Sequence, residues 1–218
     1  GTQGNDNSFD PSISADGRYV AFVSYASNLV SGDTNGGVHV FVHDRQTGQN
    51  TRVSVASDGT QGNSVSLDPS ISADGRYVAF SSVATNLVLG DTNDICDVFV
   101  HDRQTGQTTR VSVASDGTQG NGESHSGSSA ISADGRYVAF ESAADNLVNG
   151  DTTGYGDVFV HDRGPAAAPA QLDVSAISPL QQVGVPFAVT ITAKDGYGNT
   201  DAGFNGEVWL SGSSGKVN

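Results

Sequence analysis

The sequence predicts an all-β chain that is built mainly from one repeated sheet of four strands. The heptapeptide DGRYVAF occurs three times, at residues 16–22, 74–80 and 134–140, and VFVHDR follows each copy at the same distance. The copies are separated by 58 and then 60 residues, and a period of this size is typical of repeat architectures. All but three of the 24 acidic residues are Asp, which favours turns, whereas Glu favours helices. We therefore expect very little helix.

Each repeat contains four short runs of β-branched or aromatic residues that are bounded by turn formers. In the first repeat they cover residues 11–14, 18–24, 38–44 and 51–56. Ala15-Asp16-Gly17 and Gln46-Thr47-Gly48 predict tight hairpins, because each contains a glycine that tolerates positive φ. The link between the second and third runs is longer, and its apolar pair Leu29-Val30 is expected to close the edge of the core.

Both faces of the second run are apolar. Tyr19, Ala21 and Val23 share one face, and Val20 and Phe22 share the other. A sheet of this kind must be covered on both sides. Four-stranded sheets packed face to face around an axis are propeller blades, whereas a solenoid coil uses about half as many residues per turn.

The segment DPSISADGRYVAF resembles the repeat of TolB-type β-propellers, a WD-like family, and the resemblance covers residues 1–163. Ala15 and Ala73 stand where that family usually has Pro. The resemblance implies three blades, at residues 1–58, 59–116 and 117–163. It implies no particular activity, because such propellers serve as binding platforms, periplasmic adaptors or gates on peptidases.

The repeat array is expected to be open at both ends. Residues 1–5 repeat the sequence of residues 59–63, which follows a fourth strand, and Gly164-Pro165-Ala166 begins a segment that replaces the fourth strand of the third repeat. Propellers usually close with about four to eight blades, so two apolar sheet faces need a cover. Three explanations remain open: a piece of a longer surface protein, two copies that close a six-bladed ring, or strands donated between subunits of a filament. Residues 171–175 are a further candidate for completing the third blade from within the chain, because their LDVS is similar to the RVSV of the fourth strands.

A second β domain is predicted after a linker at residues 164–170. Strands are expected at residues 171–177, 187–194 and 207–211. The segment GVPFAVTITAKDGYGN resembles the early strands of bacterial immunoglobulin-like modules, which run to about 80 to 100 residues. Residues 171–218 therefore predict a partial immunoglobulin-like sandwich.

The long loops of the repeats carry the best candidate metal sites, with the pattern D-x-[NT]-x-x-x-D. Alternating oxygen ligands in a loop can wrap a hard cation, and calcium is the expected cofactor. The second repeat offers Asp91, Asn93, the carbonyl of Ile95 and Asp97. The third repeat offers Asp151, Thr153, the carbonyl of Tyr155 and Asp157.

The corresponding residues of the first repeat are Asp33, Asn35, Gly37 and His39. A calcium site there is expected to be weak or absent, since imidazole is a poor ligand for calcium. The alternative for all three loops is that the Asp and Asn side chains form turns in front of a strand and bind no metal.

No catalytic site is predicted. The triplets His43-Asp44-Arg45, His101-Asp102-Arg103 and His161-Asp162-Arg163 recur at the same strand end, whereas a catalytic constellation is assembled once. We expect Asp-to-Arg or Asp-to-backbone bonds between blades. Cys96 is expected to be a small core residue, and the sequence contains no nucleophile elbow, zinc motif or phosphate loop.

The net charge of −14 disfavours nucleic acid as a partner, and no apolar run is long enough for a membrane helix. Residues 1–10 lack the features of a signal peptide, so any export signal is expected to have been removed. The sequence predicts a non-enzymatic, secreted or cell-surface protein with a structural or adhesive role, stabilised by calcium. The alternatives are a propeller module that binds carbohydrate or protein, and the non-catalytic propeller of a peptidase.

Overall fold

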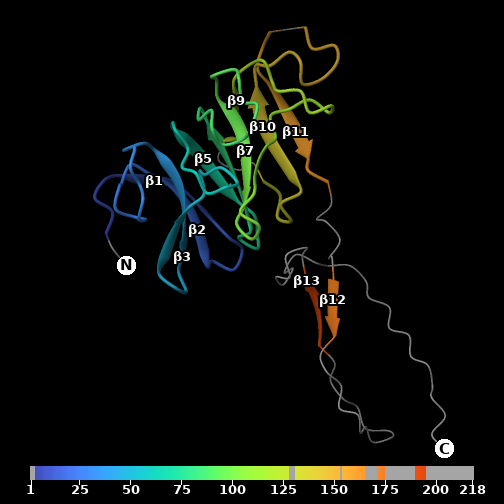
Figure 1. The fold of residues 1–218 in the computed structure, drawn as a ribbon. Coiled ribbons are helices and arrows are strands. Elements are labelled where there is room, and N and C mark those ends of the chain that lie inside the picture. The colour runs from blue at the N-terminus through green and yellow to red at the C-terminus, as the bar shows by residue number, and fades with distance from the viewer. Residues whose placement is uncertain (1–2, 128–130, 153, 165–170, 175–189, 195–218) are drawn as a thin grey trace, which may run out of the picture. The chain divides into compact units, whose positions relative to one another are not determined.

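The computed structural model describes residues 3–127, 131–152, 154–164, 171–174 and 190–194. The chain divides into two compact units, Gly1–Gly164 and Pro165–Asn218. All the named elements of the described residues are β-strands, and the predicted all-β class is therefore confirmed for them. The sheets of the first unit follow one another along the chain, as the colours of Figure 1 show.

The first unit contains three antiparallel sheets, which we call blades 1, 2 and 3. Blade 1 has the strand order β1 (Ser8–Ile13), β2 (Tyr19–Ser24), β3 (His39–Asp44) and β4 (Gln49–Arg52). Blade 2 has the order β5 (Ser66–Ile71), β6 (Tyr77–Ser82), β7 (Asp97–Asp102) and β8 (Thr108–Arg110). Blade 3 has the order β9 (Ser124–His125), β10 (Tyr137–Ser142) and β11 (Asp157–Asp162). The four-stranded repeat is thus confirmed for blades 1 and 2.

The outer strands differ from the predicted ranges. The first strand begins earlier than expected, at Ser8, and its pairing with β2 is interrupted by a bulge between Phe9 and Ser12. The fourth strand was expected at residues 51–56 but covers Gln49–Arg52. It ends there because the amides of Val53 and Ser54 both donate to the carbonyl of Val40, at 2.9 and 3.4 Å, which breaks the one-to-one ladder.

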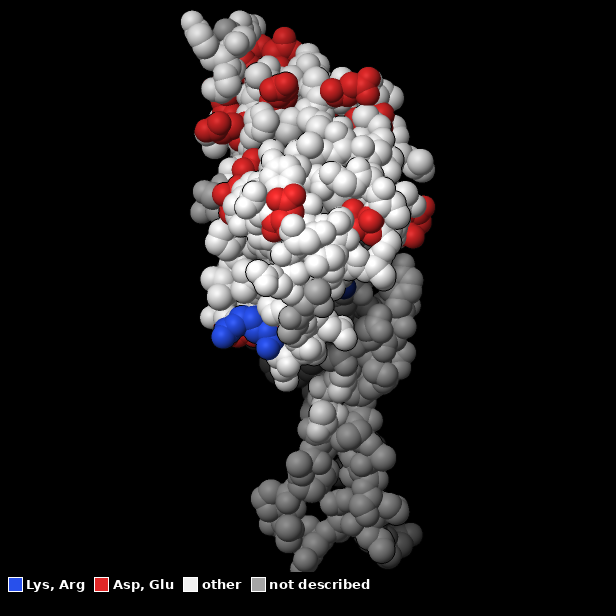
Figure 2. Space-filling model, turned by 90° about the vertical axis from the view of Figure 1, so that its left-hand side faces the viewer, with Lys and Arg blue, Asp and Glu red and all other residues white. Residues whose placement is uncertain are grey.

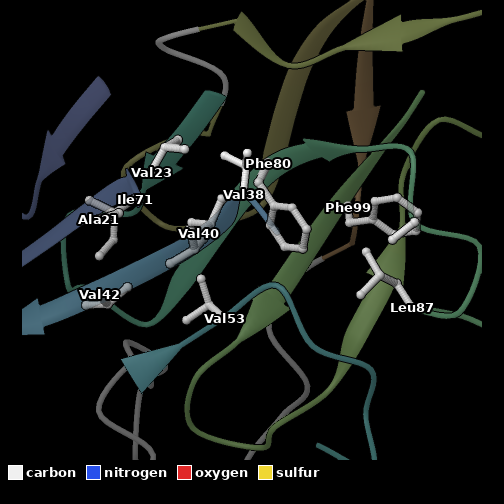
Figure 3. Close-up of a cluster of buried hydrophobic side chains, with 12 residues drawn as sticks. Ala21, Val23, Val38, Val40, Val42, Val53, Ile71, Phe80, Leu87 and Phe99 are labelled. Carbon is white, nitrogen blue, oxygen red and sulfur yellow. The ribbon is translucent and has the colours of Figure 1, made fainter. Parts of the chain in front are cut away.

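Apolar layers lie between successive blades. Between blades 1 and 2 the layer contains Val40 and Val42 from β3 and Phe80 from β6, all fully buried (Figure 3). Between blades 2 and 3 the layer contains Val98 and Val100 from β7 and Phe140 from β10. We call the side of a blade that packs on the next blade its downstream face, and the opposite side its upstream face. This face-to-face packing matches the predicted covering of both sheet faces for blade 2, which has an apolar layer on each side.

The leucine of the loop apolar pair behaves as predicted where a preceding blade is present. Leu87 is buried between blades 1 and 2, and Leu147 is buried between blades 2 and 3. Their counterpart in blade 1, Leu29, is only half-buried. The leucine therefore closes the layer between two blades.

The second unit contains one described hairpin. The strands β12 (Gln171–Val174) and β13 (Ile191–Lys194) pair with each other in a sheet of their own. The idea that residues 171–175 complete blade 3 stays a prediction, because the pairing with β13 uses one edge of β12. The predicted strand at residues 207–211 lies outside the described residues, and so does most of the predicted immunoglobulin-like sandwich. In the described parts of the chain, no helix has the length and apolar character needed to cross a membrane.

Candidate cation sites in the long loops

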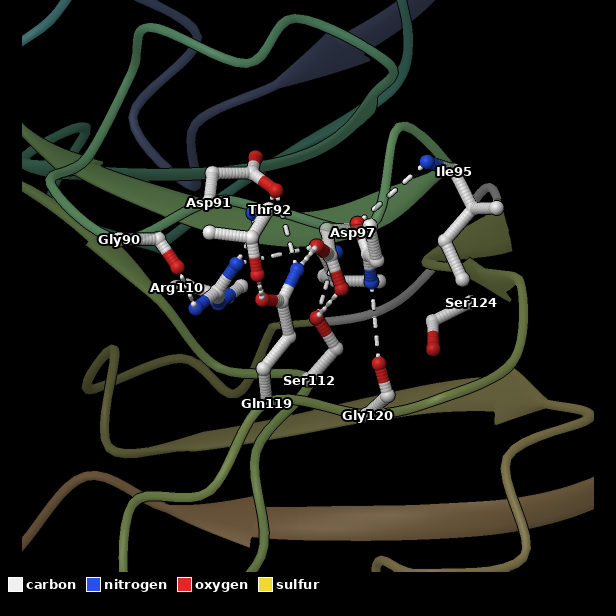
Figure 4. A network of polar contacts seen from close by, with 12 residues as sticks. Gly90, Asp91, Thr92, Ile95, Asp97, Arg110, Ser112, Gln119, Gly120 and Ser124 are labelled. Carbon is white, nitrogen blue, oxygen red and sulfur yellow. Dashed lines mark hydrogen bonds and ion pairs between the residues drawn. The ribbon is translucent and has the colours of Figure 1, made fainter.

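Blade 2 brings its two predicted calcium-binding carboxylates together around an arginine. Asp91 lies in the long loop, Asp97 begins β7, and Arg110 ends β8 (Figure 4). One guanidinium nitrogen of Arg110, Nη1, lies 3.3 Å from Asp91 Oδ1 and 3.2 Å from Asp97 Oδ2. All three side chains are at least nine-tenths buried. The guanidinium is therefore the cation that the two carboxylates share.

Two further side chains complete this cluster. Gln119 Nε2 donates to both carboxylates, at 3.0 Å to Asp91 and 3.1 Å to Asp97. Ser112 donates its hydroxyl to Asp97 Oδ1 at 2.6 Å. Each oxygen of Asp97 thus has a hydrogen-bond donor, as a buried carboxylate requires.

Asn93 has a different role from the one that calcium binding requires. Its Oδ1 accepts a hydrogen bond from the amide of Ile95 at 3.3 Å, and its Nδ2 donates to the carbonyl of Gly120 at 3.0 Å. The first bond is the turn that was the alternative interpretation of this loop. The second ties the loop to the segment that leads into blade 3.

The groups that surround Asp91 and Asp97 do not suit a calcium ion in this arrangement. Calcium takes oxygen ligands, whereas the N–H groups of Arg110 and Gln119 face the two carboxylates. Among the described residues, no group of three or more His, Cys, Asp or Glu side chains is placed to hold a metal ion. A calcium ion at Asp91 and Asp97 would have to displace Arg110.

Burial dominates the electrostatics of Asp97. It raises the pKa of this carboxyl above its ordinary value, while the hydrogen bonds of Ser112 and Gln119 and the charge of Arg110 oppose the rise. The carboxylate is therefore costly to keep charged without its partners.

Blade 1 has the same cluster with a histidine in place of the second aspartate. Asp33 Oδ1 lies 3.4 Å from Arg52 Nη1 and 4.0 Å from His39 Nε2. His39 is fully buried, and its Nε2 lies 2.8 Å from Asn35 Oδ1. Burial lowers the pKa of His39, and the charge of Arg52 lowers it further. The imidazole is therefore held in its neutral form.

The cluster of blade 1 is less well satisfied than that of blade 2. Asp33 Oδ1 is buried and has no hydrogen-bond donor among the described residues. Gln61, the counterpart of Gln119, places its Nε2 3.3 Å from His39 Nε2 and donates no hydrogen bond to Asp33 Oδ1. The glutamine of blade 1 therefore contacts the histidine, whereas the glutamine of blade 2 contacts both carboxylates.

Blade 3 offers the least enclosed loop. Asp151 is half-buried, whereas Asp157 is exposed and Tyr155 is 78% exposed. Thr153 lies outside the described residues, and the sequence has no arginine after Arg163 that could take the place of Arg110. Among the described residues of this loop, no group of three or more metal-ligating side chains is placed to hold an ion.

Sequence reasoning missed Arg110, Ser112 and Gln119. They lie 13, 15 and 22 residues after Asp97, outside the loop motif. Their counterparts in the first repeat, Arg52, Ser54 and Gln61, stand at the same offsets from His39. This shared spacing is the signal that could have identified them.

The HDR triplets form ion pairs within blades, not between them. Asp102 binds the guanidinium of Arg76 through two parallel hydrogen bonds of 3.0 and 2.9 Å, and both residues belong to blade 2. The same fork joins Asp44 to Arg18 and Asp162 to Arg136. The predicted Asp-to-Arg bond is present, but its placement between blades was wrong because each fork joins neighbouring strands of one sheet.

The arginine of the triplet makes the contact between blades. Arg103 of blade 2 lies over the ring of Tyr19 in blade 1, at 4.3 Å from the ring centroid, and Arg163 of blade 3 lies over Tyr77 of blade 2 at 4.4 Å. Each of these stacks is a cation–π contact. Cys96 is buried, which raises the pKa of its thiol to about 12, so it behaves as the expected core residue.

The fold and these repeated clusters define a module of β-propeller type. No protein-family model and no curated protein matches the chain. Among solved structures, TolB from Acinetobacter baumannii is similar over 73% of this chain and 30% of TolB, with 20% identity and a TM-score of 0.42. The β-propeller domain of the Trilobed protease from Pyrococcus furiosus is similar over 88% of this chain and 55% of that one, with 14% identity and a TM-score of 0.36.

A prolyl endopeptidase is also similar, over 74% of this chain and 21% of the endopeptidase, with 15% identity and a TM-score of 0.44. The chain thus spans about half or less of the length of each of these proteins. These likenesses concern the fold, and the activities of those proteins are not transferred to this chain.

Proposed function

We propose that this chain is a non-enzymatic, structural module of an extracellular protein. The observation that carries the proposal is the internal pairing of the repeated charged residues. Arg110 is shared by two buried carboxylates, and each HDR aspartate is forked to an arginine of its own blade. Side chains that could perform chemistry are therefore engaged in holding strands together.

The HDR forks provide the test. Asp102 and Arg76 are 10% and 15% exposed, whereas Asp162 and Arg136 are 44% and 37% exposed. Arg76→Ala is expected to lower the melting temperature of the full chain clearly, and Arg136→Ala, the matched control, is expected to lower it little. Unchanged melting of Arg76→Ala would contradict a structural role for the forks.

The surface supports an extracellular setting. The chain carries a net charge of −14, and Figure 2 shows acidic side chains spread over the face that it presents, with far fewer basic ones. Such a surface favours solubility and disfavours nucleic acid.

Ligand binding is the second candidate function. Tyr155 and Tyr25 are aromatic residues of the long loops, with 78% and 46% of their surfaces exposed. Exposed aromatic rings suit contact with a sugar or a protein partner. A glycan array with the full chain tests this: a reproducible hit that is lost in Tyr155→Ala would favour a binding module, and silence would favour the structural role.

Calcium remains a prediction for the same loops. If Arg110 occupies the position of the cation, the melting temperature of the wild-type chain should not respond to calcium or to a chelator. Arg110→Gln removes the guanidinium and leaves the two carboxylates, so this variant is expected to melt higher when calcium is added. A fall in the wild-type melting temperature on chelation would instead favour the calcium site.

A further inference from the structure

The two contacts between blades follow one rule. The downstream face of blade 1 presents Val40 and Val42 to blade 2, and the downstream face of blade 2 presents Val98 and Val100 to blade 3. These four valines are at most 1% exposed. The same residues of the repeat therefore form the same kind of interface twice.

Blade 3 presents an equivalent face that nothing covers in the described residues. Val158 and Val160 stand at the positions of Val98 and Val100, and they are 73% and 66% exposed. Tyr137 is 40% exposed, whereas Tyr77, its counterpart in blade 2, is 8% exposed. This face has the composition of a blade-binding surface.

A contact between a tyrosine of one blade and a glycine and an arginine of the next accompanies each apolar layer, and we call it the lock. At Gly75 of blade 2, a Cβ would lie 2.2 Å from the ring of Tyr19 in blade 1, and at Gly135 of blade 3 it would lie 2.1 Å from the ring of Tyr77. The tyrosine of one blade thus packs on the hairpin glycine of the next, beneath the arginine described above. Only glycine leaves room for the ring and adopts the positive φ of this turn.

The residues for one further lock are present, but within the described residues they do not contact each other. Tyr137 of blade 3 is stacked only by Arg136 of its own blade, at 4.8 Å, among the described residues. At Gly17 of blade 1, a Cβ would have no tyrosine within 4 Å. Arg45 is exposed, and no aromatic ring of the described residues lies beneath it.

The upstream face of blade 1 also lacks the cover that its counterparts have. Ile13 is 59% exposed, whereas Ile71, the equivalent residue of blade 2, is 7% exposed. Phe22 is half-buried, whereas Phe80 is fully buried. Among the described residues, nothing therefore covers the downstream face of blade 3 or the upstream face of blade 1.

We propose that the occupant of the blade 3 face is blade 1 of a second copy of this chain. The ring of Tyr137 packs on Gly17 of the partner subunit and lies beneath Arg45 of the partner subunit. The contact is head-to-tail, and it continues the two interfaces already present within the chain. Two copies supply six blades, within the range of about four to eight with which propellers close; a rotation that does not close gives an open chain of copies instead.

One side chain opposes this contact. In blade 2, Ser81 bonds Ser126 of blade 3 across the interface, with 3.0 Å between the hydroxyls. The corresponding pair in the new interface is Glu141 with Asp10 of the partner subunit, as the strand registers show. Two acidic side chains repel each other, so the association is expected to strengthen with salt and in Glu141→Ser.

The experiment uses the full chain and measures its mass by sedimentation velocity over a range of concentrations. At 1 M salt, where the Debye length is about 3 Å, we expect a concentration-dependent dimer or longer head-to-tail species. Val160→Asp and Arg45→Ala are each expected to weaken association at least about tenfold, since the first places a charge in the apolar layer and the second removes the stack. Leu89→Lys is the matched control, because this loop leucine is fully exposed and lies outside the interface.

A mixture of the two variants tests the head-to-tail geometry. The Arg45→Ala copy keeps an intact blade 3 face, and the Val160→Asp copy keeps an intact blade 1 face, so together they form one native interface. The mixture should therefore associate more strongly than either variant alone. All variants are placed at exposed positions, and circular dichroism is used to check that each of them folds.

A folded chain that stays monomeric at every concentration and salt would overturn the proposal, and so would oligomers that Val160→Asp and Arg45→Ala leave unchanged. Neither result would affect the proposed structural role, which the melting of the HDR variants tests separately.

Discussion

Blades 1 and 2 build the same buried cluster from nearly the same residues, with one exchange. Asp33, Arg52, Ser54 and Gln61 of blade 1 correspond to Asp91, Arg110, Ser112 and Gln119 of blade 2, but His39 stands where blade 2 has Asp97. In blade 2 the arginine lies between two carboxylates, and in blade 1 it faces one carboxylate and a neutral imidazole. Both blades therefore contain the buried arginine, but the side chains that face its charge differ between them.

The exchange reverses the dependence of each cluster on pH. Burial lowers the pKa of His39, so the unfolded chain takes up this proton more readily, and stability is lost as the pH falls below about 6.5. Burial raises the pKa of Asp97, so the folded chain holds this proton more tightly, and stability is lost as the pH rises through the pKa of the folded state. Of these two clusters, the one in blade 1 is therefore the acid-sensitive one.

The largest expected effect is the loss of Arg110. Arg110→Ala leaves two buried carboxylates without their cation, and we expect the free energy of unfolding to fall by about 3–5 kcal/mol at pH 7. Arg52→Ala is the matched variant and should cost less, because only Asp33 loses an ion partner. Urea unfolding of the full chain measures both, and equal losses would show that the second carboxylate is irrelevant.

The next effect is acid destabilisation of the whole chain. His101 is buried, which lowers the pKa of its imidazole to about 4, and its Nδ1 lies 2.9 Å from the hydroxyl of Thr108. Because the pKa of histidine in the unfolded chain is about 6.5, this residue alone should lower the free energy of unfolding by up to about 3 kcal/mol as the pH falls from 6.5 to 4. Unfolding free energies at intervals across this range measure the loss.

His101→Gln should flatten the acid loss, because it removes the buried proton acceptor. His125→Gln is the control, since half of that side chain is exposed. A stability that does not change between pH 6.5 and 4 would contradict the burial-driven neutrality of His101.

The repeat made the fold predictable, and the long-range partners made the site hard to predict. DGRYVAF and VFVHDR mark two adjacent strands in every copy, so a sheet with two apolar faces, and hence a stack of blades, follows from local sequence. The pairing of Asp91 with Asp97 was also local, and the structure brings both carboxylates to one centre. A loop motif does not reveal which cation another strand brings to that centre, and Arg110 comes from β8.

The boundaries of the fourth strand escaped prediction for a similar reason. The β-branched run at residues 51–56 has strong strand propensity, but Val53 and Ser54 share one acceptor on β3. Propensity describes single residues, whereas the end of a ladder depends on the register with its neighbour.

The smallest effect is expected for His39→Asp, which gives the cluster of blade 1 the same residues as the cluster of blade 2. His39→Asp places a carboxylate beside Ser54, Arg52 and Gln61, the counterparts of the three residues that bind Asp97. We expect the unfolding free energy at pH 7 to change by less than about 1 kcal/mol, because every new acceptor has a donor. The difference should then favour the variant as the pH falls from 7 to 5, since the variant no longer carries the buried imidazole. His39→Gln separates the loss of the imidazole from the gain of the carboxylate. If the variant and the wild type keep parallel stability curves over this range, the exchange between His39 and Asp97 does not set the difference between the blades.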